Sequence, residues 1–481
     1  MAYLERKIDK FLADWKSRQD RKPLIVKGAR QIGKTESIKR FAESAYESVV
    51  YINFLEKPIF GKIVSDGYSP DDIIRNITQI DGSLRFVPHE TVIVFDEIQE
   101  YPDIATCFKF FCIDGRYDVI ASGSLLGIHY RKIHSVSVGY QETFEMTSLD
   151  FEEFLRVDGK GAEFVDLLKS HMVEGRALPE VTMDVAGRVF MDYATVGGMP
   201  AVVERFAGTH NFSGITSMQR EIVAAYRGDC GKYCEGLDAM KIRAVFDSVP
   251  GQLAKDYKKF QYSKVSKNAR AREYEGCVEW LVEAGILNKC CNMAFPELPV
   301  RGNTRSDAFK LYMADTGLLL SMLDDEAALD FKLNRNFNTY KGAVAENAVA
   351  EALRKAGKDL VYFKRDDSTL EEDFFLRTVD SLVPVEVKAR SGMSKSLKTL
   401  ISSDHYPDIR FGVKLRAGNI GFSDGIWTFP LFCAFLLPDV LPQLPRQQHN
   451  FANGDFSDSQ ISKLSCWKGY GHLPKLFASP H

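Results

Sequence analysis

The sequence predicts an α/β protein with several domains, and three observations support this prediction. The chain has 481 residues, and about 100–200 residues per domain gives two to four domains. In the first third, apolar runs such as PLIVK, SVVYINF and TVIVF alternate with helical patterns, which is typical of a parallel sheet covered by helices. After a mostly helical stretch, apolar strand patterns return from about residue 308, which predicts a second α/β unit.

The composition narrows the class of protein. The 62 Lys and Arg against 65 Asp and Glu give a net charge of −3, so any nucleic-acid site must be a local patch. The most apolar late stretch, IWTFPLFCAFLL, is short and contains Pro430, so we expect no membrane span. Nine scattered cysteines and a charged amino terminus indicate reduced thiols and no signal peptide, which predicts a cytoplasmic protein.

The domain boundaries follow from these changes of pattern. We expect an α/β domain at 1–158, a helical segment at 159–305, a second α/β domain at 306–440 and a flexible tail at 441–481. The tail is polar and has no hydrophobic periodicity, which is the reason for expecting flexibility there.

A phosphate-binding loop is predicted at residues 28–35, where GARQIGKT fits GxxxxGK[ST] between a strand and a helix. Backbone N–H groups of such a loop wrap phosphates, a role in which Lys34 would reach the β/γ oxygens and Thr35 would bind Mg²⁺. The residues expected to hold ATP are Gly28, Ala29, Arg30, Gln31, Ile32, Gly33, Lys34, Thr35 and Glu36.

Further catalytic residues are expected at the ends of the following strands. The buried run TVIVF ends in Asp96, which can support Mg²⁺, and Glu97, which can activate water. Ser122 closes the run YDVIAS, where it would either sense the γ-phosphate or cap a turn. Arg30 and Arg131 are the candidates for an arginine that stabilises the transition state.

Four segments together, GARQIGKT, TVIVFDEIQE, IDGRYDVIASGSLLG and SLDFEEFL, resemble a prokaryotic AAA-type P-loop ATPase family. Its members carry a carboxyl-terminal domain of unknown function that is similar to PD-(D/E)xK nucleases. The resemblance covers roughly residues 1–440. It implies a P-loop AAA-type parallel-sheet domain, a central helical and winged-helix segment, and a carboxyl-terminal α/β domain like restriction endonucleases.

A basic stretch at 255–272 is the candidate nucleic-acid contact. It holds seven Lys and Arg against one acid, Asp256, and precedes a helical pattern that ends near AGIL. Together with the resemblance, this arrangement implies a winged helix whose cations neutralise DNA phosphates. The alternative is a solvated basic face or a surface between domains.

A second candidate site combines three acids with a lysine. In VPVEVK, Glu386 and Lys388 share one face of a strand, and Asp373 opens an apolar run thirteen residues upstream. Glu346 lies on the inward face of a predicted helix. The resemblance matches Asp373, Glu386 and Glu346 to Mg²⁺ ligands and Lys388 to the residue that orients the nucleophile. A plain cross-strand ion pair is the alternative for Glu386 and Lys388.

Two functions remain open from the sequence. The first is a Mg²⁺-dependent ATPase, with Lys34, Glu97 and Ser122 in catalytic roles, that couples nucleotide state to DNA binding and a nuclease-like domain in which Lys388 acts. The second is a slow nucleotide-driven switch or adaptor whose nuclease-like domain is inactive and holds a partner. A homo-oligomer is compatible with the resemblance, and a monomer or dimer stays equally open.

Overall fold

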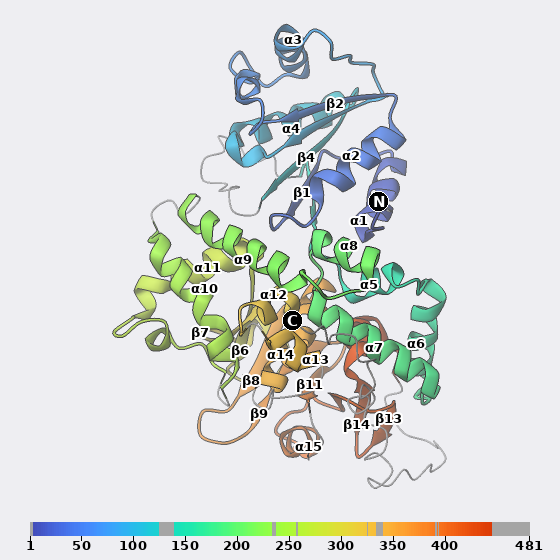
Figure 1. Cartoon of the computed structure of the whole chain (residues 1–481), viewed down its shortest axis with the longest axis vertical. Helices are drawn as coiled ribbons and strands as arrows, with labels where there is room; N and C mark the ends of the chain where they lie inside the picture. Colours follow the sequence, from blue (N-terminus) through green and yellow to red (C-terminus); the bar gives the residue numbers. More distant parts are fainter. Residues whose placement is uncertain are drawn as a thin grey trace, which may run out of the picture.

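The computed structural model describes residues 3–124, 139–232, 237–255, 258–324, 326–332, 340–389, 392 and 394–444. Three parts follow one another along the long axis of the molecule, as Figure 1 shows. The amino-terminal sheet lies at one end, a layer of helices lies in the middle, and two further sheets lie at the other end.

The amino-terminal domain is built on a five-stranded parallel sheet in the order β2-β3-β4-β1-β5. Every residue of β3 is buried, and its side chains alternate between two apolar cores. Both faces are therefore covered by helices, as the continuous apolar run predicts. The elements are α1 (Lys7–Ser17), β1 (Leu24–Gly28), α2 (Lys34–Ala45), β2 (Ser48–Asn53), α3 (Pro70–Ile80), β3 (Thr91–Asp96), α4 (Phe108–Asp114), β4 (Asp118–Ser124) and β5 (Glu142–Glu145).

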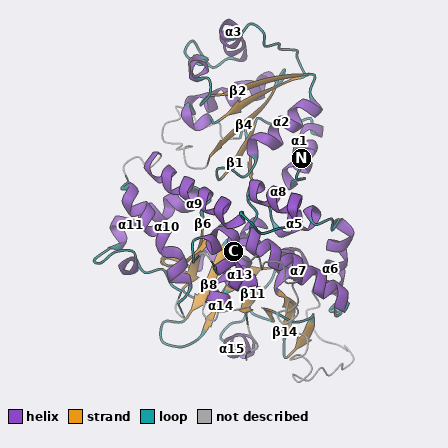
Figure 2. Cartoon of the chain, viewed as in Figure 1, coloured by secondary structure: helices purple, strands orange, loops and turns teal. Residues whose placement is uncertain are grey.

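The central part is helical, and Figure 2 shows it as a purple layer between regions that contain strands. Its first helix begins with a capping box, in which Asp150 and Glu153 each accept a hydrogen bond from the other's backbone N–H. The helices are α5 (Phe151–Val157), α6 (Ala162–Glu174), α7 (Glu180–Val196), α8 (Pro200–Thr209), α9 (Ile215–Lys232), α10 (Ala239–Leu253) and α11 (Ala271–Glu283).

The carboxyl-terminal part holds a four-stranded sheet, β7-β6-β8-β9, and a five-stranded sheet, β10-β11-β12-β14-β13. The strands are β6 (Leu287–Met293), β7 (Thr304–Met313), β8 (Leu360–Lys364), β9 (Glu371–Glu372), β10 (Phe374–Arg377), β11 (Leu382–Lys388), β12 (Gly412–Arg416), β13 (Gly421–Ser423) and β14 (Ile426–Pro430). The helices are α12 (Thr316–Ser321), α13 (Ala327–Lys332), α14 (Tyr340–Lys355), α15 (Lys395–Ser402) and α16 (Leu437–Val440).

Strand β6 joins two segments that the sequence assigned to different domains. It pairs antiparallel with β7 and parallel with β8, so residues on both sides of the expected boundary at 305 share one sheet. Strand β11, which carries Glu386 and Lys388, pairs antiparallel with β10. Asp373 is the residue immediately before β10.

One large apolar core connects all three parts. It includes Val26 of β1, Tyr193 of α7 and Leu415 of β12. In the described part of the chain, no helix is long and apolar enough to cross a membrane. The expected tail lies outside the described residues from position 445 onward.

Candidate nucleotide site and carboxylate cluster

The loop between β1 and α2 has a backbone that requires glycine. Gly33, the residue before α2, has φ 92°, which is the left-handed region. A side chain at Gly28 would come within 2.2 Å of the Met146 carbonyl oxygen. These two positions explain why the loop can fold tightly against the end of β5.

Lys34 folds back onto its own loop. Its Nζ donates hydrogen bonds to the carbonyl oxygens of Gly28, at 3.0 Å, and Ala29, at 2.7 Å. The loss of solvent around this ammonium lowers its pKa to about 8, against the opposing effect of Glu97 and Asp96. The nearby carbonyl oxygens hold the cation at the place where phosphate oxygens would compete for it.

Asp96 is the centre of a hydrogen-bond network at the carboxyl edge of the sheet. Its side chain is buried, and its Oδ2 accepts from Thr35 Oγ1 at 3.0 Å. Ser122 donates to Oδ1. Thr35, Asp96 and Ser122, which the sequence proposed separately, therefore meet at one point, and the oxygens of Thr35 and Asp96 suit a magnesium ion.

Two contacts to Asp96 were not anticipated from the sequence. Tyr51 OH donates to Asp96 Oδ2 at 2.6 Å, and Asn53 Nδ2 lies 3.4 Å from the same oxygen. Both residues lie on β2, beside β3 in the sheet. The polar residues at the end of SVVYIN were a usable signal, but the order of strands in the sheet was needed to place them.

Glu97 follows Asp96 in a left-handed backbone conformation, with φ 57°. Its N–H donates to Asp96 Oδ1 at 3.0 Å, and its carboxylate accepts from Gln99. A left-handed conformation at a residue other than glycine is uncommon and is often found at functional sites.

The other predicted residues of the loop are either held by a neighbouring segment or exposed. Arg6, a buried residue before α1, donates to the Ile32 carbonyl oxygen at 2.9 Å and to the Thr147 carbonyl oxygen at 2.6 Å. Gln31 and Glu36 are exposed. Arg131 lies outside the described residues.

Glu346, on α14, lies in a cluster of opposite charges in the carboxyl-terminal part. It accepts hydrogen bonds from Lys258, from Tyr312 OH at 2.5 Å and from Lys310 Nζ at 3.3 Å. Burial alone would raise the pKa of Glu346, but Lys258 and Lys310 outweigh it and lower the pKa to about 2.

Lys310 was missed by the sequence analysis, and it lies between the predicted acids. Its Nζ is 3.1 Å from Glu371 Oε1 and 3.8 Å from Asp373 Oδ1, and its side chain is 1% exposed. Burial and Glu346 raise the pKa of Asp373 to about 6. The sequence did not indicate a functional role for Lys310, because FKLYM has the pattern of an ordinary buried strand.

Glu386 and Lys388 form an ion pair of their own at 2.8 Å. Glu386 Oε2 and both oxygens of the neighbouring Glu372 are buried without a hydrogen-bond partner. Burial, then the proximity of Glu386, raises the pKa of Glu372 well above its usual value.

Four acids of the cluster are each paired with a lysine. The lysines are Lys258, Lys310, Lys364 and Lys388, and the paired acids are Glu346, Glu371, Asp373 and Glu386. Across the described ranges, no three or more His, Cys, Asp or Glu side chains are grouped in a way that could hold a metal ion. The structure brings Glu346 and Asp373 to the same lysine and Glu386 to Lys388.

The basic stretch is mixed in its exposure. Lys258 contacts Glu346, whereas Lys264, Lys267, Arg270 and Arg272 are exposed. The following helix, α11, exposes the acids Glu273, Glu275 and Glu283. Most of the exposed basic side chains of this stretch thus lie in the segment before α11 and in the first turn of that helix.

Comparison with known families covers most of the chain in three pieces. Residues 20–155 match the AAA domain family. The chain therefore contains a P-loop AAA domain. Residues 187–329 and 341–434 match two domains of unknown function, DUF8612 and DUF4143. The AAA domain thus holds Lys34, Thr35 and Asp96, and the match supports ATP binding there.

Solved structures show distant likenesses. ORC2 of Aeropyrum pernix, in ADPNP-ADP complexes, is 14% identical, with 68% of this chain and 94% of that chain covered and a TM-score of 0.33. ORC1 of Aeropyrum pernix in complex with DNA is 12% identical, with 68% of this chain and 90% of that chain covered and a TM-score of 0.27. The RuvB branch migration motor of Thermotoga maritima is 15% identical, with 59% of this chain and 89% of that chain covered and a TM-score of 0.27. No curated protein matches.

Proposed function

We propose that the protein is a Mg²⁺-dependent ATPase that acts as a nucleotide-driven switch. The meeting of Thr35, Asp96 and Ser122 beside Lys34 supports this proposal. Lys34 binds the β/γ phosphates, Thr35 and Asp96 hold the metal, and Glu97 orients the attacking water. Magnesium supplies neutralisation of the charge that develops on the phosphates.

The test is steady-state ATP hydrolysis together with equilibrium ATP binding. We expect Glu97→Gln to bind ATP and to lose at least a hundredfold in hydrolysis rate, because the attacking water loses its base. Lys34→Ala should lose binding. Glu100→Gln, three residues from Glu97, is the control and should hydrolyse ATP at the wild-type rate. Hydrolysis by Glu97→Gln at the wild-type rate would remove Glu97 from the mechanism.

For the carboxyl-terminal part we favour a platform that holds a partner over an active nuclease. Lys310 already supplies a positive charge among Glu346, Glu371 and Asp373. Glu346, Glu371, Asp373 and Glu386 each lie within 4 Å of a lysine ammonium, so their negative charge is already largely offset and attracts a divalent cation less strongly. This supports the inactive form of the nuclease-like domain.

A cleavage assay separates the two functions of this domain. Single- and double-stranded DNA and RNA would be incubated with Mg²⁺ or Mn²⁺, with and without ATP, using wild type and Lys388→Ala. We expect no cleavage by either protein. Cleavage by the wild type that is lost in Lys388→Ala would establish a nuclease and overturn the platform.

We further propose that Lys264, Lys267 and Arg270, which precede α11, and Arg272, in its first turn, contact nucleic acid. Such contacts weaken steeply with salt because binding releases counterions. The double variant Lys264→Glu with Lys267→Glu should weaken DNA binding at least tenfold and reduce its salt dependence. Arg301→Glu, a 92% exposed residue elsewhere, is the matched control. Unchanged DNA affinity in the double variant would leave a protein as the partner of the switch.

A further inference from the structure

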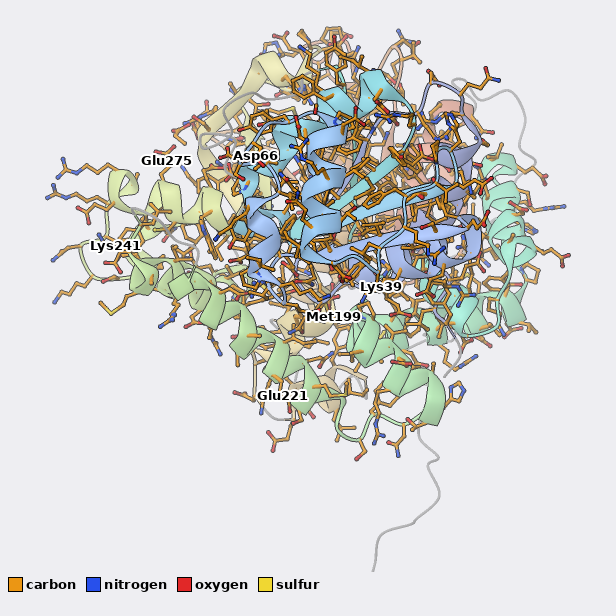
Figure 3. All side chains as sticks on the ribbon, turned by 90° about the horizontal axis from the view of Figure 1, so that it is seen from above. Lys39, Asp66, Met199, Glu221, Lys241 and Glu275 are labelled. Atoms are coloured by element: carbon orange, nitrogen blue, oxygen red, sulfur yellow. The ribbon has the colours of Figure 1, made fainter. Side chains whose placement is uncertain are left out.

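The central helices touch the nucleotide loop through one face of α9. Tyr226 OH donates to the Arg30 carbonyl oxygen at 3.1 Å, and Arg30 Nη1 donates to Asp229 Oδ1 at 2.5 Å. Tyr226 and Asp229 are three residues apart, so they lie on the same side of the helix. Figure 3 shows the green helix that carries Glu221, which is α9, running beside the blue AAA domain, with Met199 near the junction.

Arg30 has a feature that a structural ion pair does not require. It lies inside the phosphate-binding loop, between Gly28 and Gly33, where a nucleotide would add several negative charges. A guanidinium has five N–H donors and binds phosphate through two parallel hydrogen bonds, so ATP phosphates can compete with Asp229 for it. Its side chain is 26% exposed, so it has room to turn.

Helix α9 is connected from this point to the carboxylate cluster by packed polar contacts. Arg220 Nε donates to the Ser321 carbonyl oxygen of α12 at 3.0 Å. At the other end of α12, the Thr316 N–H donates to Glu351 Oε2 of α14 at 2.8 Å. Glu346 lies on α14 as well. A displacement of α9 would therefore be transmitted to α14, the helix that carries Glu346.

We propose that Arg30 exchanges Asp229 for the phosphates of bound ATP, and that this exchange releases α9 from the nucleotide loop. Arg30 is then a positioning residue with two alternative anions, and Asp229 is the competitor that holds the nucleotide-free state. The exchange gives the two-state element that coupling between distant sites requires. The inference rests on the proposed ATP binding and adds to it the route by which the helical part responds.

The first experiment measures equilibrium affinity for a non-hydrolysable ATP analogue with Mg²⁺. Asp229→Asn keeps the size of the side chain and removes the competing charge, so the analogue should bind about five- to tenfold more tightly. Arg30→Ala should bind it more weakly, and adding Asp229→Asn to Arg30→Ala should produce no gain. Asp247→Asn is the matched control, because Asp247 lies on α10 and pairs at 2.7 Å with Arg227 of α9, a different arginine from Arg30.

A second measurement keeps the inference testable if Asp229→Asn also loosens the fold. Hydrogen exchange of α9 should increase when the analogue binds to wild type, and this increase should be absent in Arg30→Ala at saturating analogue. If Asp229→Asn binds no more tightly than wild type, or if α9 exchanges equally with and without the analogue, the exchange of partners is wrong. If wild type binds no ATP at all, the proposed function itself fails, so the two failures are distinguishable.

Discussion

Lys34 makes ATP binding dependent on pH well below the range in which a lysine ordinarily titrates. Its pKa is lowered to about 8 by desolvation, so the cation is present below pH 8 and is lost as the pH rises through that value. Only the protonated form attracts phosphate. We therefore expect ATP affinity to be about tenfold weaker at pH 9 than at pH 7, as measured by equilibrium binding across this range.

A charge-preserving variant checks this assignment. Lys34→Arg stays protonated over the whole range, so its affinity should be lower than that of wild type but nearly constant with pH. An equal loss of affinity between pH 7 and pH 9 in both proteins would assign the titration to another group.

At the scale of elements, Arg6 connects α5 to the nucleotide loop. It donates to the Ile32 carbonyl oxygen, and its Nε lies 3.2 Å from Glu153 Oε1, both side chains being about 5% exposed. Arg6→Met would leave Glu153 buried without its cation, which costs about 3 kcal/mol or more in free energy of unfolding. Urea denaturation measures this loss.

An exposed ion pair supplies the comparison for Arg6. Arg18 pairs with Glu142 at 2.6 Å, with 42% of the Arg18 side chain exposed. Arg18→Met should change the free energy of unfolding by less than about 1 kcal/mol, because solvent screens this pair. Equal losses in Arg6→Met and Arg18→Met would show that burial does not strengthen the Arg6 contact.

The same elements show how far the sequence reaches. The loop at 28–35, the buried strand before Asp96 and the parallel sheet follow from local periodicity and glycine spacing, and all appear in the structure. Tyr51, Arg6 and Lys310 could not be found in that way. Each acts through a contact with a residue more than 25 positions away, and such a contact depends on strand order and helix packing.

At the scale of the whole molecule, a single apolar core and a buried polar junction connect the AAA domain to the carboxyl-terminal part. Lys355 of α14 donates to Ser148 Oγ at 2.8 Å and to the Leu149 carbonyl oxygen at 2.9 Å, and it pairs with Glu351 at 2.6 Å. The Lys355 side chain is 4% exposed. This ammonium therefore holds the carboxyl-terminal part against the segment that follows the AAA sheet.

Removing the Lys355 ammonium should lower the local stability of both the AAA domain and the carboxyl-terminal part. Lys355→Met leaves Glu351 buried without its cation, and burial already raises the pKa of Glu351. We expect faster hydrogen exchange in β1 of the AAA domain and in β11, whereas Lys358→Met, on a half-buried lysine three positions further along, should leave both strands unchanged. Faster exchange in β11 alone would mean that the AAA domain is stable without the junction, and the nucleotide state would then need a route other than the packed helices to reach the carboxylate cluster.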